Sequence, residues 1–305
     1  SNVSRNELIA GLDLGTTKVC CVAAEVDEGS KPVVVGVGVC PSGGIRRGVV
    51  VDIEAATRSV EDAVAKASQQ CGQPIVSVYV SITGEHIQSL NARGVTAITH
   101  PDQEITEADR QRVLEQSRTI VVPADRDIIH AIPRSYSVDG QEGIREPVGM
   151  SGTRLEVETH IVTSAHTFLL NVEKCIARAR LGLQVTVLEA LATSLATLTP
   201  AERDLGTCVL DIGGGTTDIA VVADGEIFHS AVIPVGGNHV TNDIAQLFRV
   251  TTDEAERVKV NYGSALPNQV GETESVGLTQ IGRTDPRPLR RRALCAIIEA
   301  RVQEL

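Results

Sequence analysis

Residues 211–218 read Asp-Ile-Gly-Gly-Gly-Thr-Thr-Asp and lie in the middle of an otherwise apolar stretch, 208–222. Residues 13–18 read Asp-Leu-Gly-Thr-Thr-Lys and interrupt a second apolar stretch, 8–24, in the same way. Short apolar runs that are split by a glycine turn predict a β-hairpin. Because this composite pattern occurs twice, far apart in the chain, the sequence predicts two similarly folded halves rather than a solenoid of short repeats.

Both glycine turns carry residue types that bind polyphosphates. Glycine lets backbone N–H groups approach a phosphate without a Cβ atom in the way, and threonine hydroxyls add donors. The carboxylates of Asp13 and Asp211 cannot bind phosphate directly, so they indicate a divalent cation, Mg²⁺ with its waters, between them and the phosphates. One Asp-Gly turn commonly just closes a hairpin, but two such turns, each followed by Thr-Thr, favour a metal–nucleotide site. The candidate phosphate-binding residues are Gly15, Thr16, Thr17, Lys18, Gly213, Gly214, Gly215, Thr216 and Thr217.

The remaining apolar periodicity indicates a mixed α/β chain. Residues 33–39 and 75–82 are predicted strands, and residues 53–67, 167–181 and 190–198 are predicted helices.

The segment from residue 84 to residue 164 has a different texture. Its short apolar runs are interrupted by prolines and glycines, among them Pro123 and Pro133. It contains a predicted helix, 106–120, whose first residue is a good N-cap. Predicted strands follow at 128–132, 135–138 and 156–163. We interpret this segment as a small α+β insertion.

The composition narrows the classes of function. The 305 residues include 28 Lys+Arg against 39 Asp+Glu, a net charge of −11, and only 2% are aromatic. Neither the phosphate contacts nor the base-stacking platforms of a nucleic-acid-binding protein are therefore expected. Seven cysteines without a C-x-x-C pair indicate free thiols in a reducing compartment. No apolar run reaches the ~18 residues of a membrane span, and the histidines show no zinc-ligand spacing. The sequence predicts a cytoplasmic protein with two or more packed units.

Residues 13–18 resemble the first phosphate motif of the actin/Hsp70/sugar-kinase superfamily, and residues 211–218 resemble the second. Other stretches narrow the resemblance to the FtsA family of bacterial cell-division proteins, over nearly the whole chain. These stretches are GIRRGVVVD at 44–52, RLEVETHIVT at 154–163, VLEALA at 187–192, YGSALP at 262–267 and IIEAR at 297–301. The resemblance implies an α/β, actin-like fold, with two duplicated halves around a nucleotide cleft and a small α+β subdomain inserted in the first half.

The same resemblance implies four subdomains. Subdomain IA would comprise residues 1–83 and 165–202, the inserted subdomain IC residues 84–164, subdomain IIA residues 203–250 and subdomain IIB residues 251–305. The family continues with a third glycine-rich adenosine motif and a C-terminal amphipathic helix that binds membrane. Because neither motif occurs before Leu305, the resemblance implies a C-terminally truncated chain in which IIA and IIB are incomplete.

ATP and Mg²⁺ are the implied cofactors. Asp13, Glu189 and Asp211 match the family's catalytic acids, and Asp13 and Asp211 would hold the metal. Glu256 and Lys259 match a pair on the adenosine side. Residues three apart on a helix face the same way, although spacing alone would favour an ordinary surface ion pair. The second-half turn near the phosphates matches Gly236, Gly237 and Asn238.

An arginine-rich segment is the candidate partner site. Five arginines within residues 283–292 of an acidic protein are commonly a solvated face, and the alternative is a dock for an acidic peptide. Relatives in the FtsA family bind the acidic C-terminal tail of the tubulin-like protein FtsZ. The candidate docking residues are Arg287, Arg290, Arg291, Arg292, Arg301 and Glu304.

The resemblance predicts an ATP-binding division scaffold with at most weak ATPase activity. It would polymerise, tether FtsZ filaments to the inner face of the cytoplasmic membrane at the division site, and recruit later division proteins through the inserted subdomain. It would reach the membrane only through a C-terminal helix absent from this chain. The alternatives are an actin-like pilus-assembly scaffold and a phosphotransferase of the same superfamily, for which no catalytic base beyond the turn acids is evident.

Overall fold

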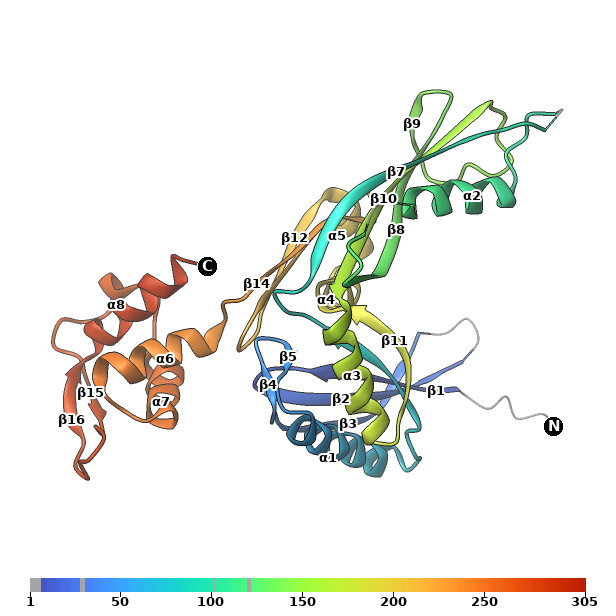
Figure 1. Ribbon diagram of the computed structural model, residues 1–305. Helices are drawn as coiled ribbons and strands as arrows, with labels where there is room; N and C mark the ends of the chain where they lie inside the picture. The colour runs from blue at the N-terminus through green and yellow to red at the C-terminus, as the bar shows by residue number, and fades with distance from the viewer. Residues whose placement is uncertain (1–6, 28–30, 101, 120–121) are drawn as a thin grey trace. The chain divides into compact units, whose positions relative to one another are not determined.

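The computed structural model describes residues 7–27, 31–100, 102–119 and 122–305 (Figure 1). The chain divides into two compact units. Unit 1 comprises Ser1–Asp211 and Thr216–Pro234, and unit 2 comprises Ile212–Gly215 and Val235–Leu305. No helix within the described residues combines the length and the apolar character that a membrane crossing needs.

The central sheet of unit 1 has the strand order β11-β6-β1-β2-β3. Strands β1, β2 and β3 form an antiparallel meander, so the predicted hairpin over residues 8–24 is confirmed. Strand β6 pairs with β1 and β11 in parallel. The bounds are β1 Glu7–Leu14, β2 Lys18–Val26, β3 Val33–Pro41, β6 Ser77–Ile82 and β11 Gly182–Leu188. A small ribbon, β4 (Ile45–Arg46) with β5 (Val49–Val50), follows β3.

Helices α1 (Ile53–Cys71) and α3 (His166–Arg178) pack with this sheet around one apolar core. The carboxylate of Asp52 accepts a hydrogen bond from Ala55 N and caps the start of α1. The backbone of α1 approaches β3 so closely that a Cβ atom at Gly38 would overlap the Ala63 carbonyl oxygen. The glycine in this strand is therefore required by packing.

The inserted segment forms a second sheet with the order β7-β10-β8-β9, covered by helix α2 (Figure 1). Its elements are β7 Gln88–Ala97, α2 Glu107–Arg118, β8 Arg126–Val138, β9 Gln141–Ile144 and β10 Arg154–Ala165. The predicted helix at 106–120 is confirmed in type, although Ile120 lies outside the described residues. The α+β character of the segment is as expected.

The separation of residues 128–132 from 135–138 is wrong, because β8 runs continuously through Pro133. The register against β10 shifts between Glu158 and Thr159, and Thr159 faces Pro133. On the other side, β9 reaches only Tyr136 and Val138. Proline is tolerated in a strand where the ladder is irregular or has no neighbour.

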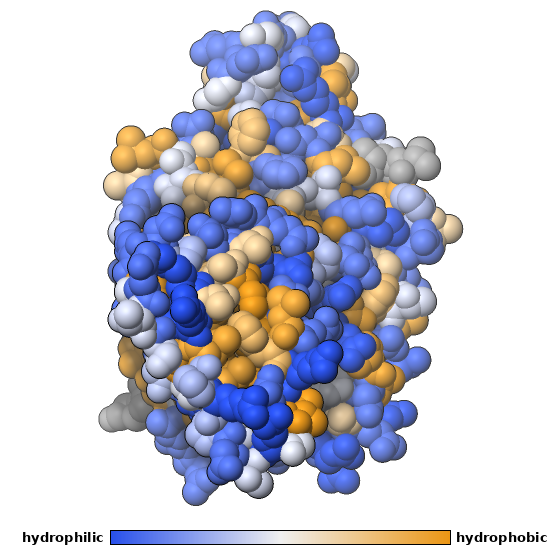
Figure 2. All heavy atoms as spheres, turned by 90° about the vertical axis from the view of Figure 1, so that its left-hand side faces the viewer, coloured by the Kyte–Doolittle hydropathy of each residue, from blue (hydrophilic) through white to orange (hydrophobic). Residues whose placement is uncertain are grey.

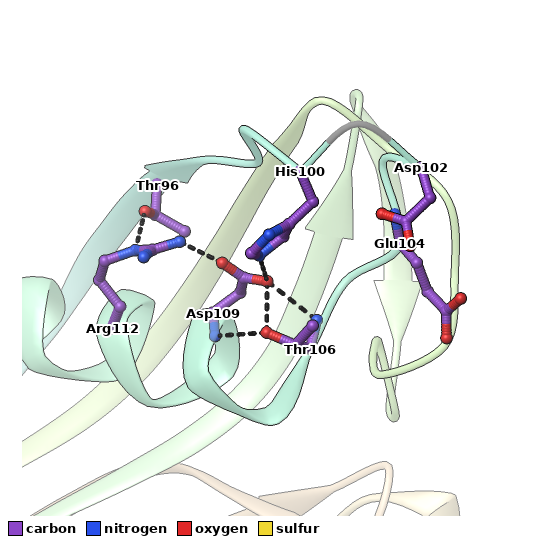
Figure 3. Close-up of polar contacts among 7 residues, drawn as sticks. All are labelled: Thr96, His100, Asp102, Glu104, Thr106, Asp109 and Arg112. Atoms are coloured by element: carbon purple, nitrogen blue, oxygen red, sulfur yellow. Dashed lines mark hydrogen bonds and ion pairs between the residues drawn. The ribbon is translucent and has the colours of Figure 1, made fainter.

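The start of α2 is fastened by a buried carboxylate. Asp109 is fully buried, and its Oδ2 atom accepts hydrogen bonds from Thr106 Oγ1 at 2.7 Å and Thr106 N at 2.9 Å (Figure 3). Figure 3 also shows His100, 3.2 Å from the same oxygen, and Arg112, which contacts Oδ1. Burial alone would raise the pKa of Asp109, but these hydrogen bonds and charges outweigh it and lower the pKa.

The second apolar stretch of the sequence forms a third sheet with the order β12-β13-β14. Its strands are β12 Thr207–Ile212, β13 Thr217–Ala223 and β14 Glu226–Ile233. The predicted hairpin over residues 208–222 is confirmed, and both glycine turns are followed by a strand that pairs with the next one. Helices α4 (Glu189–Thr197) and α5 (Pro200–Leu205) contact β13.

Unit 2 is a small helical unit with a two-stranded ribbon. It contains α6 (Gly237–Phe248), α7 (Thr252–Tyr262), a 3-10 turn (Pro267–Gln269), β15 (Ser275–Leu278), β16 (Arg287–Arg290) and α8 (Arg291–Val302). Its apolar core includes Ile244, Val258 and Leu294, one from each helix. None of these elements is predicted from the sequence except the helical spacing of Glu256 and Lys259.

Candidate functional site

Four carboxylates of unit 1 influence one another's pKa values through their charges, although no group of three or more histidine, cysteine or acidic residues within the described part of the chain is arranged to hold a metal ion by itself. Asp13 lies on β1, Glu189 is the first residue of α4, Asp211 lies on β12 and Asp218 lies on β13. Burial raises the pKa of Glu189 to about 9, and the charges of Asp218, Asp13 and Asp211 add to the effect. Burial likewise raises the pKa of Asp218 to about 7, against a hydrogen bond from Thr83. The pKa of Asp13 is also raised, by burial and by the Asp211 charge.

Hydroxyl groups hold three of these carboxylates. Ser81 Oγ donates to Asp13 Oδ1 at 2.8 Å, and Thr193 Oγ1 donates to Asp211 Oδ2 at 2.6 Å. Thr83 Oγ1 lies 2.7 Å from both carboxylate oxygens of Asp218. Within the described part of the chain, none of the four acids has an arginine or lysine within ion-pair distance. Asp218 is buried and the other three acids are partly buried, and of the basic residues only Lys18 offsets the raised pKa of Asp13 through its charge. A divalent cation held through water by Asp13 and Asp211 would neutralise this repulsion.

The first glycine turn is tightly closed. A Cβ atom at Gly15 would lie 2.5 Å from the Lys18 carbonyl oxygen. Only glycine therefore fits at this position, and without a Cβ atom the turn leaves its backbone open to a phosphate. Thr16 Oγ1 accepts a hydrogen bond from Gly48 N at 3.1 Å. Thr17 and Lys18 are exposed. Thr16 is therefore anchored to the loop between β4 and β5, while its two neighbours are free to meet a ligand.

The second glycine turn is joined to the start of α6 within unit 2. Gly237 N donates to Gly213 O at 2.9 Å, and Asn238 N donates to Gly214 O at 2.8 Å. A Cβ atom at Gly236 would lie 2.5 Å from Gly213 O. The structure thus brings together the predicted residues Gly213–Gly215 and Gly236–Asn238. Thr216 and Thr217, which belong to unit 1, are buried.

Glu256 and Lys259 form the predicted pair on α7. Lys259 Nζ lies 2.7 Å from Glu256 Oε2, 2.9 Å from Thr241 Oγ1 and 3.2 Å from Gly237 O. Thr241 also donates a short hydrogen bond to Glu256. The pair is consequently linked to the start of α6.

The supporting hydroxyls of Ser81, Thr83, Thr193 and Thr241 are not predicted from the sequence. Asp218 lies in the second predicted turn, but its place in the site is not predicted either. The only available signal is a hydroxyl residue at the end of a strand or within a helix, and that pattern is too common to single out these positions.

The predicted arginine dock is divided in two. Arg287 and Arg290 on β16 are exposed, while Arg291 pairs with Glu274 at 2.6 Å and Arg292 with Glu272 at 3.2 Å. At the far end of α8, Arg301 forms a bidentate pair with Asp243, at 2.7 and 2.9 Å, and also contacts Glu304.

Unit 2 also exposes apolar side chains. They are Ile212, Leu247, Val260, Tyr262, Leu266, Ile281 and Val302. On the face of the molecule drawn in Figure 2, apolar side chains gather into an area bordered by hydrophilic ones. Unit 2 therefore offers both arginines and exposed apolar groups to a partner.

Solved structures indicate which fold this arrangement belongs to. The PilM–PilN type IV pilus biogenesis complex matches with a TM-score of 0.62 at 18% identity, over 83% of this chain and 69% of that chain. MreB5 of Spiroplasma citri bound to ADP matches with a TM-score of 0.51 at 16% identity, over 98% of this chain and 76% of that one. The chain therefore has an actin-like α/β fold with an inserted subdomain.

Sequence comparison identifies the family. Residues 84–163 match the model of the SHS2 domain inserted in FtsA, and residues 208–301 match the model of cell division protein FtsA. The chain is 44% identical to FtsA of Pseudomonas aeruginosa over 305 residues, which are 100% of this chain and 73% of that protein. It is 39% identical to FtsA of Escherichia coli K12 over 299 residues, 98% of this chain and 71% of that protein. The chain therefore belongs to the FtsA family of bacterial cell-division proteins.

Proposed function

We propose that this chain is an ATP-binding, actin-like scaffold of cell division. The observation that carries the proposal is the cluster of Asp13, Glu189, Asp211 and Asp218, because its mutual repulsion calls for a cation beside a closed glycine turn. The structure of MreB5, a protein of similar fold, was solved with bound ADP, and this supports the proposal that the chain binds an adenine nucleotide.

The residues of the chain would divide the binding of Mg²⁺·ATP among them. Asp13 and Asp211 would hold the metal through water, and Glu189 would orient the water nearest the phosphates. Bound Mg²⁺ supplies positive charge to the phosphate oxygens. The two glycine turns would donate backbone N–H groups to the phosphates, and Glu256 and Lys259, braced by Thr241, would face the adenosine. ATP would serve mainly as a structural ligand and polymer switch, with slow hydrolysis.

Nucleotide binding is tested with a fluorescent ATP analogue, followed by anisotropy in Mg²⁺ and in EDTA. We expect binding in Mg²⁺ and a loss of about 10-fold or more in affinity for Asp211→Asn, because removing a group that supports a metal costs that much. Asp224→Asn, an exposed aspartate on the turn between β13 and β14, is the matched control. An unmodified protein that binds no nucleotide in either buffer would contradict the proposal.

The subdomain assignment is part of the proposal. Residues 1–83 and 165–202 would form IA, 84–164 IC, 203–250 IIA and 251–305 IIB. The family model that matches residues 84–163 supports the bounds of IC. Subdomain IC would contribute to a filament of identical copies and recruit later division proteins.

We further propose that unit 2 docks the acidic C-terminal tail of FtsZ and so links FtsZ filaments to the inner face of the cytoplasmic membrane. Support comes from the exposed Arg287 and Arg290 and from Arg301 at the end of α8. Arginine–carboxylate pairs recognise acidic peptides through bidentate hydrogen bonds.

The docking proposal is tested by fluorescence anisotropy of a synthetic FtsZ tail peptide. We expect salt-sensitive binding that Arg301→Glu abolishes and a triple substitution of residues 290–292 weakens. Arg58→Glu, an exposed arginine on α1, should leave binding unchanged. Equal binding by all variants would remove unit 2 from the dock. ATP turnover that depends on a small-molecule acceptor would instead favour the phosphotransferase alternative.

A further inference from the structure

Two hydroxyl groups at the end of β6 deepen the proposed nucleotide function. Ser81 Oγ donates to Asp13, which precedes the first glycine turn. Thr83 Oγ1 lies 2.7 Å from both oxygens of Asp218, which follows the second turn. Residues two apart in an extended chain project to the same side. One strand end therefore touches a carboxylate from each of the two phosphate motifs.

The environment of Thr83 is tight. Its side chain is 5% exposed and that of Asp218 is 2% exposed. A Cβ atom at Gly48 would lie 2.7 Å from Thr83 Cγ2, and Gly48 N donates to Thr16 of the first turn. Thr83 is thus packed against the loop that anchors Thr16 while its hydroxyl contacts Asp218. Packing on both sides therefore limits the movement of the Thr83 hydroxyl and of the carboxylate that it contacts.

We propose that Ser81 and Thr83 are positioning residues of the Mg²⁺–nucleotide site. They hold Asp13 and Asp218 in the orientation that the metal complex requires, and they set how strongly Mg²⁺ increases the affinity for nucleotide. They do not contact the nucleotide themselves. This inference rests on the proposed nucleotide function and extends it from the acids to the hydroxyls that orient them.

The nucleotide affinity without metal and the increase in that affinity caused by Mg²⁺ can be measured independently. The affinity for nucleotide in EDTA reports the glycine turns and the adenosine side. The ratio of the affinities in Mg²⁺ and in EDTA, the magnesium gain, reports the arrangement of the acids. A residue with a purely structural role would change both quantities or neither. A positioning residue for the acids changes the magnesium gain alone.

The experiment compares Thr83→Val, Thr83→Ser, Ser81→Ala and the unmodified protein. Valine keeps the shape of threonine without the hydroxyl, and serine keeps the hydroxyl. Thr186→Val, on the neighbouring strand β11, is the matched control. Each variant is titrated with the fluorescent ATP analogue in Mg²⁺ and in EDTA, and Mn²⁺ binding is followed by the loss of the electron-paramagnetic signal of the free ion.

We expect Thr83→Val and Ser81→Ala to reduce the magnesium gain and the Mn²⁺ affinity by about 10-fold, the range seen when a group that orients a metal ligand is removed. Thr83→Ser should restore both quantities, and the affinity in EDTA should stay constant. If Thr83→Val does not fold, Ser81→Ala decides alone, because Ser81 is only partly buried.

Two outcomes would overturn the inference, and they are distinguishable. If the unmodified protein shows a magnesium gain and every hydroxyl variant keeps it, the positioning role is wrong while the nucleotide function stands. If the unmodified protein binds no nucleotide in either buffer, the proposed function fails and the inference fails with it.

Discussion

The Nε2 atom of His160 lies 2.8 Å from the Oγ atom of Ser230. His160 belongs to β10 of the inserted sheet, and Ser230 belongs to β14 of the third sheet. The other ring nitrogen of His160 lies 2.8 Å from Asn91 Oδ1, and Ser89 Oγ donates to Ser230 O at 2.7 Å. A fully buried imidazole therefore joins the inserted sheet to β14 by polar contacts.

We expect His160→Ala to lower the free energy of unfolding by about 2–4 kcal/mol, because it creates a cavity and leaves buried polar groups without partners. Urea unfolding followed by circular dichroism measures the change. His166→Ala is the matched control, since His166 is exposed and pairs with the exposed Asp127. Equal losses for the two variants would contradict the role of the His160–Ser230 contact.

The same histidine makes stability depend on pH. Burial lowers the pKa of His160 to about 4, and the neighbouring charges of His229, Arg134 and His130 contribute. Its unfolded value is near 6.5, so between these two pH values the unfolded chain binds the proton that the folded chain excludes. This contribution is complete above pH 6.5 and is lost as the pH falls toward 4. Between pH 7 and pH 5 we expect a loss of about 2 kcal/mol.

The pH effect is measured as a difference between two proteins. The unmodified protein and His160→Asn are unfolded with urea at pH 7 and pH 5, so that the contributions of other titrating groups cancel. The unmodified protein should lose more stability than the variant on going to pH 5. Parallel losses in both proteins would show that His160 is not the titrating group.

The stability contribution of Glu189 depends on pH in the opposite direction to that of His160. Burial and neighbouring acids raise its pKa to about 9, so its stability contribution is present at low pH and is lost as the pH rises from about 4.5 to 9. In EDTA at pH 8 we therefore expect Glu189→Gln to stabilise the protein by about 4–5 kcal/mol, because pH 8 lies about 3.5 units above the unfolded pKa and below the folded one. At pH 5 the two proteins should be nearly equal.

Thermal unfolding at both pH values tests this expectation. Glu173→Gln, an exposed glutamate on α3, serves as the control and should have no effect at either pH. A destabilised Glu189→Gln variant at pH 8 would mean that the carboxylate is ionised and well partnered in the folded protein.

The contact between α1 and β3 predicts a severe mutational effect. In Gly38→Ala the new methyl group would overlap the Ala63 carbonyl oxygen, so the helix must move away from the sheet. We expect a loss of about 3 kcal/mol or more, as for other overpacked cores and strained sites. Differential scanning calorimetry measures it.

Gly72→Ala is the informative comparison for Gly38→Ala. Gly72 has φ +71° but open space around its Cβ position, so only backbone strain of about 1 kcal/mol opposes the substitution. Similar losses in the two variants would exclude steric overlap as the reason for the glycine in β3.

Local pattern predicts much of unit 1. Apolar runs around the two glycine turns correctly indicate both hairpins, because the strands are short, apolar and adjacent in sequence. Alternation and helical periodicity also indicate α1, α2 and the helices on either side of β11. Strand β11 is not predicted, since the helical spacing continues to residue 181 in the sequence, whereas α3 ends at Arg178 and Arg180 turns the chain with a positive φ. Pro133 leads to the wrong prediction of two separate strands, because a strand tolerates proline only where its neighbours leave the position unpaired. A single sequence does not show which neighbours a strand has.

In the candidate site, only the residues that are proposed to contact a ligand could be predicted from the sequence. The acids and glycines stand in a repeated motif, so their chemistry is visible in the sequence. Ser81, Thr83, Thr193 and Thr241 act through other side chains, and their contacts reach across up to 135 positions of the chain. Unit 2 is least predictable, because its short helices carry polar faces and its core is shared among three of them.

The insertion point of the inserted subdomain has a mechanical consequence. The family model of that domain begins at residue 84, directly after Thr83 and two residues after the end of β6. The backbone that carries Ser81 and Thr83 is therefore one of the two chain connections of the inserted subdomain, and β10, which runs directly into α3, is the other. A displacement of the first connection would move Ser81 and Thr83, and with them the hydrogen bonds to Asp13 and Asp218.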